Sequence, residues 1–335
     1  MIENIHNNPA TLAIVIPCYN EETVLPQTLP DFINYMKDCI NKGIMATNSF
    51  LLCINDGSSD KTWSIIQDFN TQEPNIVKGI CLARNKGHQN AILAGMLYAY
   101  DETDADAIVT IDCDGQDDMH AISKMLEHYY NGKDVVYGVR NDRTTDSFAK
   151  RITAESYYKF LSHFGDESIY NHADYRLLSR RVLAELKKHD EVNLYLRGLI
   201  PTIGFDNSIV YYKRQKRIAG KSHYTISKMI NLAIDGLINS GTKPLRLIVK
   251  TGIFMTFLGI TTAILLPILY ALKICVPIWT IIACIGMILT GIQTLCLGIA
   301  AEYIGKTYIE VKHRPKYAIK ETTESRKEQS HDKRV

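Results

Sequence analysis

The first half of the chain alternates short apolar runs with longer stretches in which apolar residues recur at helical spacing. The apolar runs are rich in β-branched residues and almost uninterrupted, as in strands buried on both faces of a parallel sheet. Alternating strands and helices are typical of βαβ units in a doubly wound α/β sheet. The predicted strands are 12–17, 50–55, 76–82, 107–112 and 133–139, and the predicted helices are 21–40, 59–69, 88–100 and 119–130.

The C-terminal third has a different pattern, in which two long runs contain no charged residue. Residues 251–272 and 274–301 are separated only by Lys273, and each run can cross a ~30 Å hydrocarbon layer as a helix. Lys and Arg outnumber Asp and Glu by nine to two in residues 204–250 and by nine to six in 302–335. The positive-inside rule then predicts a transmembrane hairpin with both termini in the cytoplasm. A buried helical hairpin in a soluble protein is the alternative.

Two amphipathic stretches lie between these regions. Residues 147–164 have a basic edge and fit either a core helix or a helix on a membrane surface. Residues 227–239 lead directly into the first uncharged run and predict an interfacial helix. The predicted layout is an α/β domain over 1–225, a juxtamembrane helix over 226–246, two transmembrane helices over 247–301 and a charged tail over 302–335, disordered beyond Pro315.

The composition excludes several classes of protein. Of the 335 residues, 46% are hydrophobic and 22% are charged, which rules out a disordered or collagen-like chain. A net charge of only +2 gives no overall electrostatic case for nucleic acid as a partner. The eight cysteines form no CxxC pair, and the N-terminus lacks the apolar stretch of a signal peptide. We therefore expect reduced cysteines and an α/β domain that stays in the cytosol.

Carboxylates gather where the fourth predicted strand ends. Asp112 and Asp114 flank a single residue, and Gln116 follows two positions later. Oxygen ligands suit Mg²⁺ or Mn²⁺, and Mg²⁺ commonly bridges a few protein ligands to substrate phosphates. A solvated acidic turn before the next helix would contain the same residues, so the motif by itself does not establish a metal site.

Polar segments also follow the first three predicted strands, and ligands of such sheets bind beyond the carboxyl ends of the strands. In NDGSSD, Gly57 permits a tight turn and the serines can cap a helix, which leaves Asp56 to accept hydrogen bonds from a base or a ribose. Tyr19 offers a ring on which a base can stack. The basic segment around Lys86 precedes a helix whose N-terminus favours a phosphate, although a solvated basic turn explains it equally well.

Seven motifs occur in order along the chain, namely IVIPCYNEE, NDGSSD, ARNKGHQNAILAG, TIDCDGQD, YGVRNDR, ADYRLLSR and KRIAGKSHY. Together they resemble the family 2 glycosyltransferases of the GT-A fold. Within that family the chain is similar to the polyisoprenyl-phosphate glycosyltransferases, such as bactoprenol glucosyltransferase and dolichol-phosphate mannose synthase. The resemblance covers residues 10–316 and implies a Rossmann-like, mostly parallel sheet. The QxxRW motif of processive synthases is absent around residues 193–198, which favours a single transfer.

The resemblance also implies roles for individual residues. Asp112 and Asp114 match carboxylates that hold Mg²⁺ or Mn²⁺ with the nucleotide diphosphate, and Gln116 matches an additional ligand. Asp174 matches the carboxylate regarded as the catalytic base, but an acceptor phosphate is already ionised near neutral pH, which favours an orienting role. The remaining matches are nucleotide-binding positions (Pro17, Tyr19, Glu21, Asp56, Lys86 and Asp112), an acceptor-phosphate set (Arg140, Arg143 and Arg151) and a diphosphate or closing segment (Arg214, Arg217 and Lys221).

The implied reaction is an inverting transfer of a hexose from a nucleotide diphosphate sugar to polyprenyl phosphate. The resemblance favours a UDP-sugar, undecaprenyl phosphate and a multi-pass protein of the bacterial cell membrane that serves cell-envelope glycans. GDP-mannose is the alternative donor, and a membrane-anchored nucleotide-sugar sensor without catalysis is the alternative class. A transporter subunit is disfavoured because the uncharged runs contain no acidic, Arg or His side chain. Small residues in these runs would permit a homo-oligomer.

Overall fold

The computed structural model describes residues 8–141, 172–189, 191, 195–215 and 278–324, together with the single positions 254, 257, 261, 264 and 268. The chain divides into two compact units, of which the first contains a β-sheet and the second contains helix α10. The predicted helices 147–164 and 227–239 lie outside the described residues.

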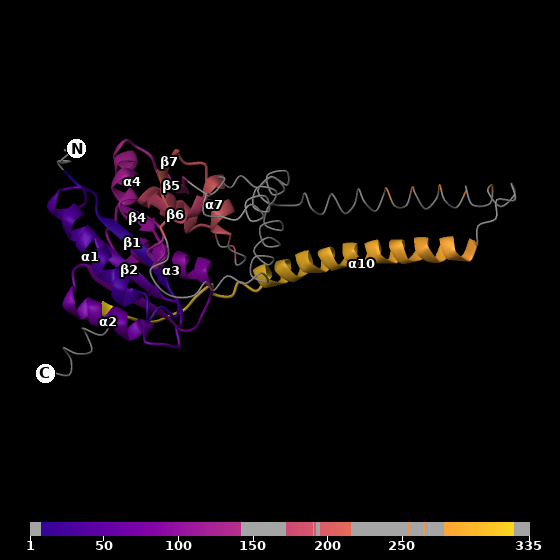
Figure 1. Ribbon diagram of the computed structural model, residues 1–335, viewed down its shortest axis with the longest axis horizontal. Coiled ribbons are helices and arrows are strands. Elements are labelled where there is room, and N and C mark those ends of the chain that lie inside the picture. The colour runs from indigo at the N-terminus through magenta and orange to yellow at the C-terminus, as the bar shows by residue number, and fades with distance from the viewer. Residues whose placement is uncertain are drawn as a thin grey trace. The chain divides into compact units, whose positions relative to one another are not determined.

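The first unit is built on a mixed sheet with helices on both faces (Figure 1). The described strands follow the order β7-β5-β6-β4-β1-β2-β3-β8 across the sheet. Their bounds are β1 Leu12–Cys18, β2 Phe50–Asn55, β3 Val77–Leu82, β4 Ala107–Thr110, β5 Val135–Arg140, β6 His172–Ser179, β7 Asn207–Tyr212 and β8 Ile319–Thr322. The helices of this unit are α1 Leu25–Asn41, α2 Thr62–Gln72, α3 His88–Glu102, α4 Ala121–Tyr130, α6 Arg180–Leu186 and α7 Leu196–Thr202.

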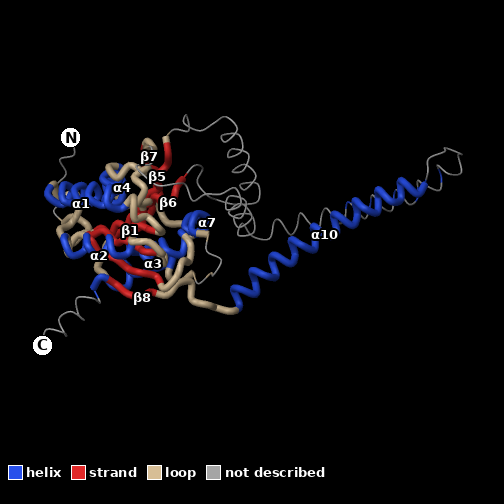
Figure 2. Tube along the Cα trace, turned by 60° about the horizontal axis from the view of Figure 1, so that its bottom comes forward, coloured by secondary structure: helices blue, strands red, loops and turns tan. Residues whose placement is uncertain are grey.

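Four of the five predicted strands form a parallel half, β4-β1-β2-β3, and the fifth, predicted at 133–139, corresponds to β5. The strands belong to one sheet, drawn red in Figure 2, with β8 at one edge. Every residue of β1 and β2 is buried. Leu12 and Ile14 pack with residues of α1 and α4, whereas Ala13 and Val15 pack with residues of α3 on the other face. Burial on both faces requires such an uninterrupted apolar sequence. The prediction of an α/β, mostly parallel sheet is therefore confirmed.

A second half of the sheet contains antiparallel pairs. Strand β6 lies between β4 and β5 and is antiparallel to both, while β5 and β7 are parallel. Strand β6 buries Asp174 and Arg176 beside Tyr175 and Leu177. The sequence analysis predicts no strand at β6, because these charged residues interrupt the apolar pattern that it relies on.

The C-terminal tail corrects one expectation. We expect disorder beyond Pro315, but β8 pairs antiparallel with β3 at the edge of the sheet. The Gly79 N–H donates to Thr323 Oγ1 at 3.1 Å, and Lys78 Nζ lies 2.8 Å from Glu324 Oε1. The expectation was wrong for these residues because an edge strand offers N–H and C=O groups that even a charged segment can pair with.

The cysteines of the described ranges agree with the expectation of reduced thiols. All of them are free, and all except Cys296 are buried. They are Cys18, Cys39, Cys53, Cys81, Cys113 and Cys296.

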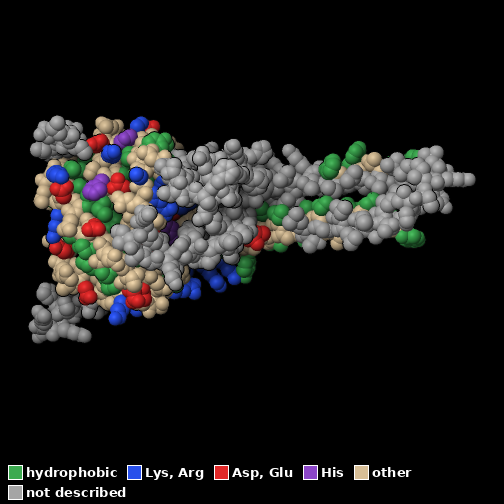
Figure 3. Space-filling view, in the orientation of Figure 1, with side chains coloured by type: hydrophobic (Ala, Val, Ile, Leu, Met, Phe, Trp, Pro, Cys, Tyr) green, Lys and Arg blue, Asp and Glu red, His purple; other side chains and the backbone are tan. Residues whose placement is uncertain are grey.

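The second unit contains α10, which runs over Ile278–Val311 and includes most of the second uncharged run. Apolar side chains are exposed along this helix, among them Trp279, Leu297 and Ile304 (Figure 3). Within the part of the chain that the structure describes, no helix is both long enough and apolar enough to cross a membrane. The first uncharged run, 251–272, lies outside the described residues apart from single positions.

Candidate active site

The candidate site lies where the parallel strands β1, β2 and β4 end. Cys18 is in register with Asn55, and the Asp56 N–H donates to the Cys18 carbonyl at 2.9 Å. The Ile111 N–H donates to the Val15 carbonyl at 3.1 Å, so the chain leaves β4 beside β1. The carboxyl ends of these strands therefore meet at one edge of the sheet, as the sequence analysis predicts.

Asp56 holds the loop that follows β3. It is 3% exposed and accepts the backbone N–H groups of Lys86 at 2.7 Å and Gly87 at 2.9 Å. Burial raises the pKa of Asp56 above its ordinary value. Gly57 allows the two loops to approach, because its φ is 62° and a Cβ there would lie 2.4 Å from the backbone carbonyl carbon of Arg84. The structure thus places Asp56 and Lys86, both predicted to bind the nucleotide, in one cluster.

The segment after β1 forms a turn against the start of α2. The Glu21 N–H donates to Thr62 Oγ1 at 2.8 Å, and the Glu21 carbonyl accepts the Val24 N–H at 3.0 Å. Pro17 lies inside β1, whereas the Tyr19 side chain just beyond the strand is 39% exposed. Of the predicted nucleotide-binding positions in this segment, Tyr19 presents an accessible ring.

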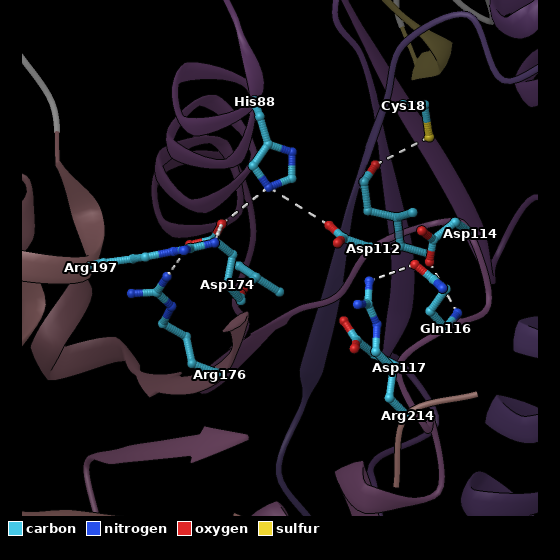
Figure 4. A network of polar contacts seen from close by, with 12 residues as sticks. Cys18, His88, Asp112, Asp114, Gln116, Asp117, Asp174, Arg176, Arg197 and Arg214 are labelled. Atoms are coloured by element: carbon cyan, nitrogen blue, oxygen red, sulfur yellow. Dashed lines mark hydrogen bonds and ion pairs between the residues drawn. The ribbon is translucent and has the colours of Figure 1, made fainter. Parts of the chain in front are cut away.

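Asp112, Asp114 and Gln116 lie in the loop that follows β4 (Figure 4). Asp114 is 6% exposed, and its Oδ1 accepts the Gln116 N–H at 3.0 Å. Burial, with smaller contributions from neighbouring carboxylates, raises the pKa of Asp112 to about 6. Arg214 Nη2 donates to Gln116 Oε1 at 2.5 Å, and the Gln215 N–H donates to the Gln116 carbonyl at 2.8 Å. The start of the predicted closing segment therefore contacts the predicted metal motif.

This set of oxygen atoms fits a divalent cation that is shared with a substrate. Within the described ranges, no group of three or more His, Cys, Asp and Glu side chains is arranged to hold a metal alone. Mg²⁺ is commonly bound by one or two carboxylates together with substrate phosphates, and Mn²⁺ also takes oxygen ligands. Two carboxylates and an amide oxygen in one loop, with a raised pKa at Asp112, match that arrangement.

Asp174 is the centre of a buried ion cluster (Figure 4). Its Oδ1 accepts hydrogen bonds from Arg176 Nη2 at 2.6 Å and Arg197 Nε at 3.1 Å, and its Oδ2 accepts from Arg197 Nη2 at 2.9 Å. Thr110 Oγ1 donates to the Asp174 carbonyl and fixes the backbone. Burial raises the pKa of Asp174, but the charge of Arg197 and the hydrogen bond from His88 outweigh it and hold this pKa well below its usual range. A carboxylate held in this way stays ionised, which favours an orienting role over proton removal.

His88 connects this ion cluster to the loop after β4. Its Nε2 lies 3.3 Å from Asp174 Oδ2 and 3.7 Å from Asp112 Oδ1 (Figure 4). The His88 side chain is 40% exposed. Burial lowers the pKa of His88, but the hydrogen bond to Asp174 and the charge of Asp112 raise it more, to about 9. A side chain that the sequence analysis does not select thus lies between the predicted metal ligand and the predicted catalytic carboxylate.

Arg140, at the end of β5, lies against a buried carboxylate. Its Nη2 is 3.4 Å from Asp117 Oδ1, and its Nε donates to the Tyr212 hydroxyl at 3.2 Å. The Tyr212 hydroxyl donates to the same Asp117 oxygen at 2.6 Å, and Asp117 is 4% exposed. The side chains of Asp117 and Tyr212 therefore fix the orientation of the Arg140 guanidinium. The other members of the predicted basic sets, Arg143, Arg151, Arg217 and Lys221, lie outside the described residues.

The sequence analysis assigns no role to several residues of this network, namely His88, Asp117, Arg176, Arg197 and Tyr212. A signal was available for Arg176, because an arginine inside an otherwise apolar segment needs a partner when it is buried. Asp117 and Tyr212 gave no such signal, because their contact joins residues 95 positions apart.

The chain is similar in sequence to several known proteins. The family model described as "Glycosyl transferase family 2" matches residues 13–187. The chain is 39% identical over 308 residues to the uncharacterized glycosyltransferase YkoT of Bacillus subtilis (strain 168), covering 92% of this chain and 90% of that protein. It is 35% identical over 321 residues to the prophage bactoprenol glucosyl transferase homolog of Escherichia coli (strain K12), covering 92% and 98%. It is 33% identical over 315 residues to the bactoprenol glucosyl transferase of Shigella phage SfV, covering 92% and 98%.

Among solved structures, the mannosyltransferase PcManGT from Pyrobaculum calidifontis, in complex with GDP-Man and Mn²⁺, is similar with a TM-score of 0.43 and 14% identity. That match covers 90% of this chain and 89% of the other. The family model spans more than half of the sequence, and the relatives match nearly all of it. The chain therefore belongs to glycosyl transferase family 2.

Proposed function

We propose that the protein transfers a hexose from a UDP-sugar to a polyprenyl phosphate such as undecaprenyl phosphate, with inversion at the anomeric carbon. Membership of the family supports the class of reaction. The names of two relatives, one a bactoprenol glucosyl transferase and the other a homolog of such an enzyme, support a lipid acceptor and a glucose donor. The product is a lipid-linked sugar for cell-envelope glycans.

The observation that carries this proposal is a contrast between two carboxylates that share one histidine. The pKa of Asp112 is raised to about 6, whereas that of Asp174 is held well below its usual range. Paired acidic groups whose environments separate their pKa values are a common mark of an active site. The first carboxylate suits a cation that arrives with a diphosphate, and the second is a fixed negative charge beside it.

On the donor side, Tyr19 would stack on the base, and the loop that Asp56 holds would face the nucleotide. Asp112 and Asp114, with the Gln116 oxygen, would hold Mg²⁺ or Mn²⁺. When bound there, the ion neutralises charge that develops on the leaving diphosphate. Arg214, which contacts Gln116, would add a positive charge on the same side.

On the acceptor side, Arg140 would bind the lipid phosphate, with Asp117 and Tyr212 setting the direction of its guanidinium. A phosphate oxygen attacks the anomeric carbon from the face opposite the nucleotide, and the bond from that carbon to the diphosphate breaks. Because the attacking phosphate is already ionised, no proton has to leave it. Asp174 then contributes by orientation, and holding both reactants in place supplies much of the rate.

The proposal includes attachment to the bacterial cell membrane through the C-terminal region, with the α/β domain and both termini in the cytoplasm. Two uncharged runs in the sequence and the exposed apolar side chains of α10 support this part. A polyprenyl acceptor keeps its tail in the bilayer, so an enzyme that uses it must work at the membrane surface. Self-association through this region is compatible with the proposal.

A donor panel tests the proposed function. The purified full chain is incubated with undecaprenyl phosphate, Mn²⁺ or Mg²⁺, and radiolabelled UDP-glucose, UDP-N-acetylglucosamine, UDP-galactose or GDP-mannose in turn. We expect one UDP-hexose to give label in the organic phase, and only with a divalent cation. Transfer from GDP-mannose alone would replace the proposed donor, and no transfer from any donor would remove the proposed reaction.

A further inference from the structure

His88 stands at a junction of three segments. It begins α3 directly after Gly87, whose φ of 85° lies in the left-handed region that favours glycine. The N–H groups of Lys86 and Gly87 both donate to the Asp56 carboxylate. Asp56, on the nucleotide side of the proposed site, therefore fixes the turn from which the His88 side chain extends.

The ring faces two carboxylates that come from neighbouring strands. Its Nε2 lies 3.3 Å from Asp174 Oδ2 and 3.7 Å from Asp112 Oδ1 (Figure 4). Strands β4 and β6 are antiparallel neighbours, with Thr110 opposite Arg176. Asp112, just after the end of β4, therefore lies near Asp174, close to the start of β6. Groups of like charge repel, and an imidazole that donates to Asp174 and lies near Asp112 offsets that repulsion.

We propose that His88 is a positioning residue that holds the Asp174 carboxylate toward Asp112 through its Nε2–H. This inference rests on the proposed function and adds His88 to the residues that the proposed reaction needs. Arg176 binds Oδ1 of Asp174, and Arg197 binds both of its oxygens. The two arginines approach Asp174 from the side away from Asp112 in Figure 4. Without the imidazole they would draw the carboxylate toward themselves, and the gap between Asp174 and the bound donor would widen.

A purely structural role for His88 predicts a different result. If the side chain served only to start α3, its loss would disturb the turn that holds Asp56, and nucleotide affinity and transfer rate would fall together. A positioning role predicts that transfer slows while nucleotide affinity is kept. Glutamine can donate a hydrogen bond from a similar place, whereas leucine cannot, so the two substitutions separate donation from packing.

The test uses the full chain with His88→Leu and His88→Gln, and with His189→Leu, in the turn after α6, as the matched control. The kcat and KM are measured for transfer from UDP-glucose to undecaprenyl phosphate, and the Kd of UDP with Mg²⁺ is measured by calorimetry. We expect His88→Leu to lower kcat by about 10- to 100-fold, the cost typical of residues that orient a site, with the Kd of UDP within about threefold. His88→Gln should recover most of that loss, and His189→Leu should match the wild type.

A second measurement does not depend on transfer. In protein labelled with ¹⁵N-histidine, the Nε2–H signal of His88 should shift in Asp174→Asn, or in Asp174→Glu should the first variant fail to fold. A wild-type kcat in His88→Leu, an equal loss of UDP affinity and kcat, or an Nε2–H signal indifferent to Asp174 would each overturn the proposal. A wild-type protein that transfers to no lipid but shows the Asp174-dependent signal would overturn the proposed function alone.

Discussion

The two halves of the sheet contribute different kinds of group to the site. In the parallel half, Asp56, Asp112 and Asp114 follow apolar strands and lie in loops that could receive a ligand. In the antiparallel half, Asp174 and Arg176 lie inside strand β6, where they are buried and paired. In the parallel half, Asp112 is half-buried in a loop, whereas the charges of β6 are fixed by their pairing with one another.

The cost of burying a charge explains the difference between half-buried Asp112 and buried Asp174. A carboxylate in an accessible loop can bind water, a proton or a cation in turn. A charged group inside a sheet is cut off from water and needs permanent partners of opposite charge. Asp174 has those partners in Arg176 and Arg197. Among the described residues Asp112 has no such pair of arginines, and burial, with smaller contributions from neighbouring carboxylates, raises its pKa to about 6. Substitutions in the parallel half should therefore lower mainly activity, and substitutions in the antiparallel half should lower mainly stability.

The largest effect is expected in the parallel half, from Asp114→Ala. The variant should keep its fold, because the residue follows β4 and is not part of the apolar core. Loss of a charged ligand for the cation should lower the transfer rate by at least ~1000-fold, about 4 kcal/mol of transition-state stabilisation. Radiolabel transfer to undecaprenyl phosphate measures it, with Asp104→Ala, an exposed acidic residue, as the control. Activity above about a tenth of the wild type would show that Asp114 does not bind the cation.

Stability should be lost mainly in the antiparallel half. Arg176 is 1% exposed and pairs with Asp174, so Arg176→Met should lower the free energy of unfolding by about 3 kcal/mol, the range found when one partner of a buried ion pair is removed. Arg197→Met should cost less, because the Arg197 side chain is 23% exposed. Denaturant unfolding followed by tryptophan and tyrosine fluorescence gives both values. Equal costs would mean that burial does not distinguish the two pairs.

A pH dependence of cation binding should appear in the parallel half. Because the pKa of Asp112 is about 6, its carboxylate is mostly charged at pH 7 and mostly protonated at pH 5. A protonated carboxyl is a poor ligand, so the Kd of Mn²⁺ with UDP should rise about tenfold as the pH falls from 7 to 5. Calorimetry at several pH values measures this, and Asp112→Asn should bind poorly at every one of them. A wild-type profile without a change near pH 6 would argue against Asp112 as a ligand.

The smallest effect concerns the edge of the parallel half. Thr323→Ala removes the acceptor of the Gly79 N–H and should cost about 1 kcal/mol of stability, the usual contribution of one hydrogen bond. Hydrogen exchange at β3 should become faster in this variant and stay unchanged in Lys320→Ala, where an exposed side chain is shortened. Unchanged exchange at Gly79 in Thr323→Ala would indicate that β8 does not protect that edge.

What could be predicted from the sequence follows the same division. The strands of the parallel half and the residues after them were found because apolar runs mark buried strands, and polar residues at their ends mark a ligand-binding edge. Strand β6 and its partner Arg197 were not found, because charged residues break the apolar pattern and their pairing depends on the folded chain. Strand β8 was missed for another reason, since its residues read as a solvated tail until β3 supplies a partner.

The contacts of His88 could not be predicted from the motif that contains it. It belongs to a motif that the sequence analysis quotes, yet its neighbours in space, Asp112 and Asp174, are 24 and 86 positions away in the sequence. Only the antiparallel pairing of β4 and β6 brings those carboxylates to one ring.

We expect Asp112 and Asp114 of the parallel half to bind the nucleotide and its cation without help from the buried ion cluster around Asp174. Calorimetric titration of UDP with Mn²⁺ into Asp112→Asn and Asp174→Asn, each assayed also for transfer, tests it most directly. We expect Asp112→Asn to lose both binding and transfer, and Asp174→Asn to bind UDP within about threefold of the wild type but to lose transfer. Equal loss of UDP affinity in the two variants would show that Asp174 also takes part in nucleotide binding.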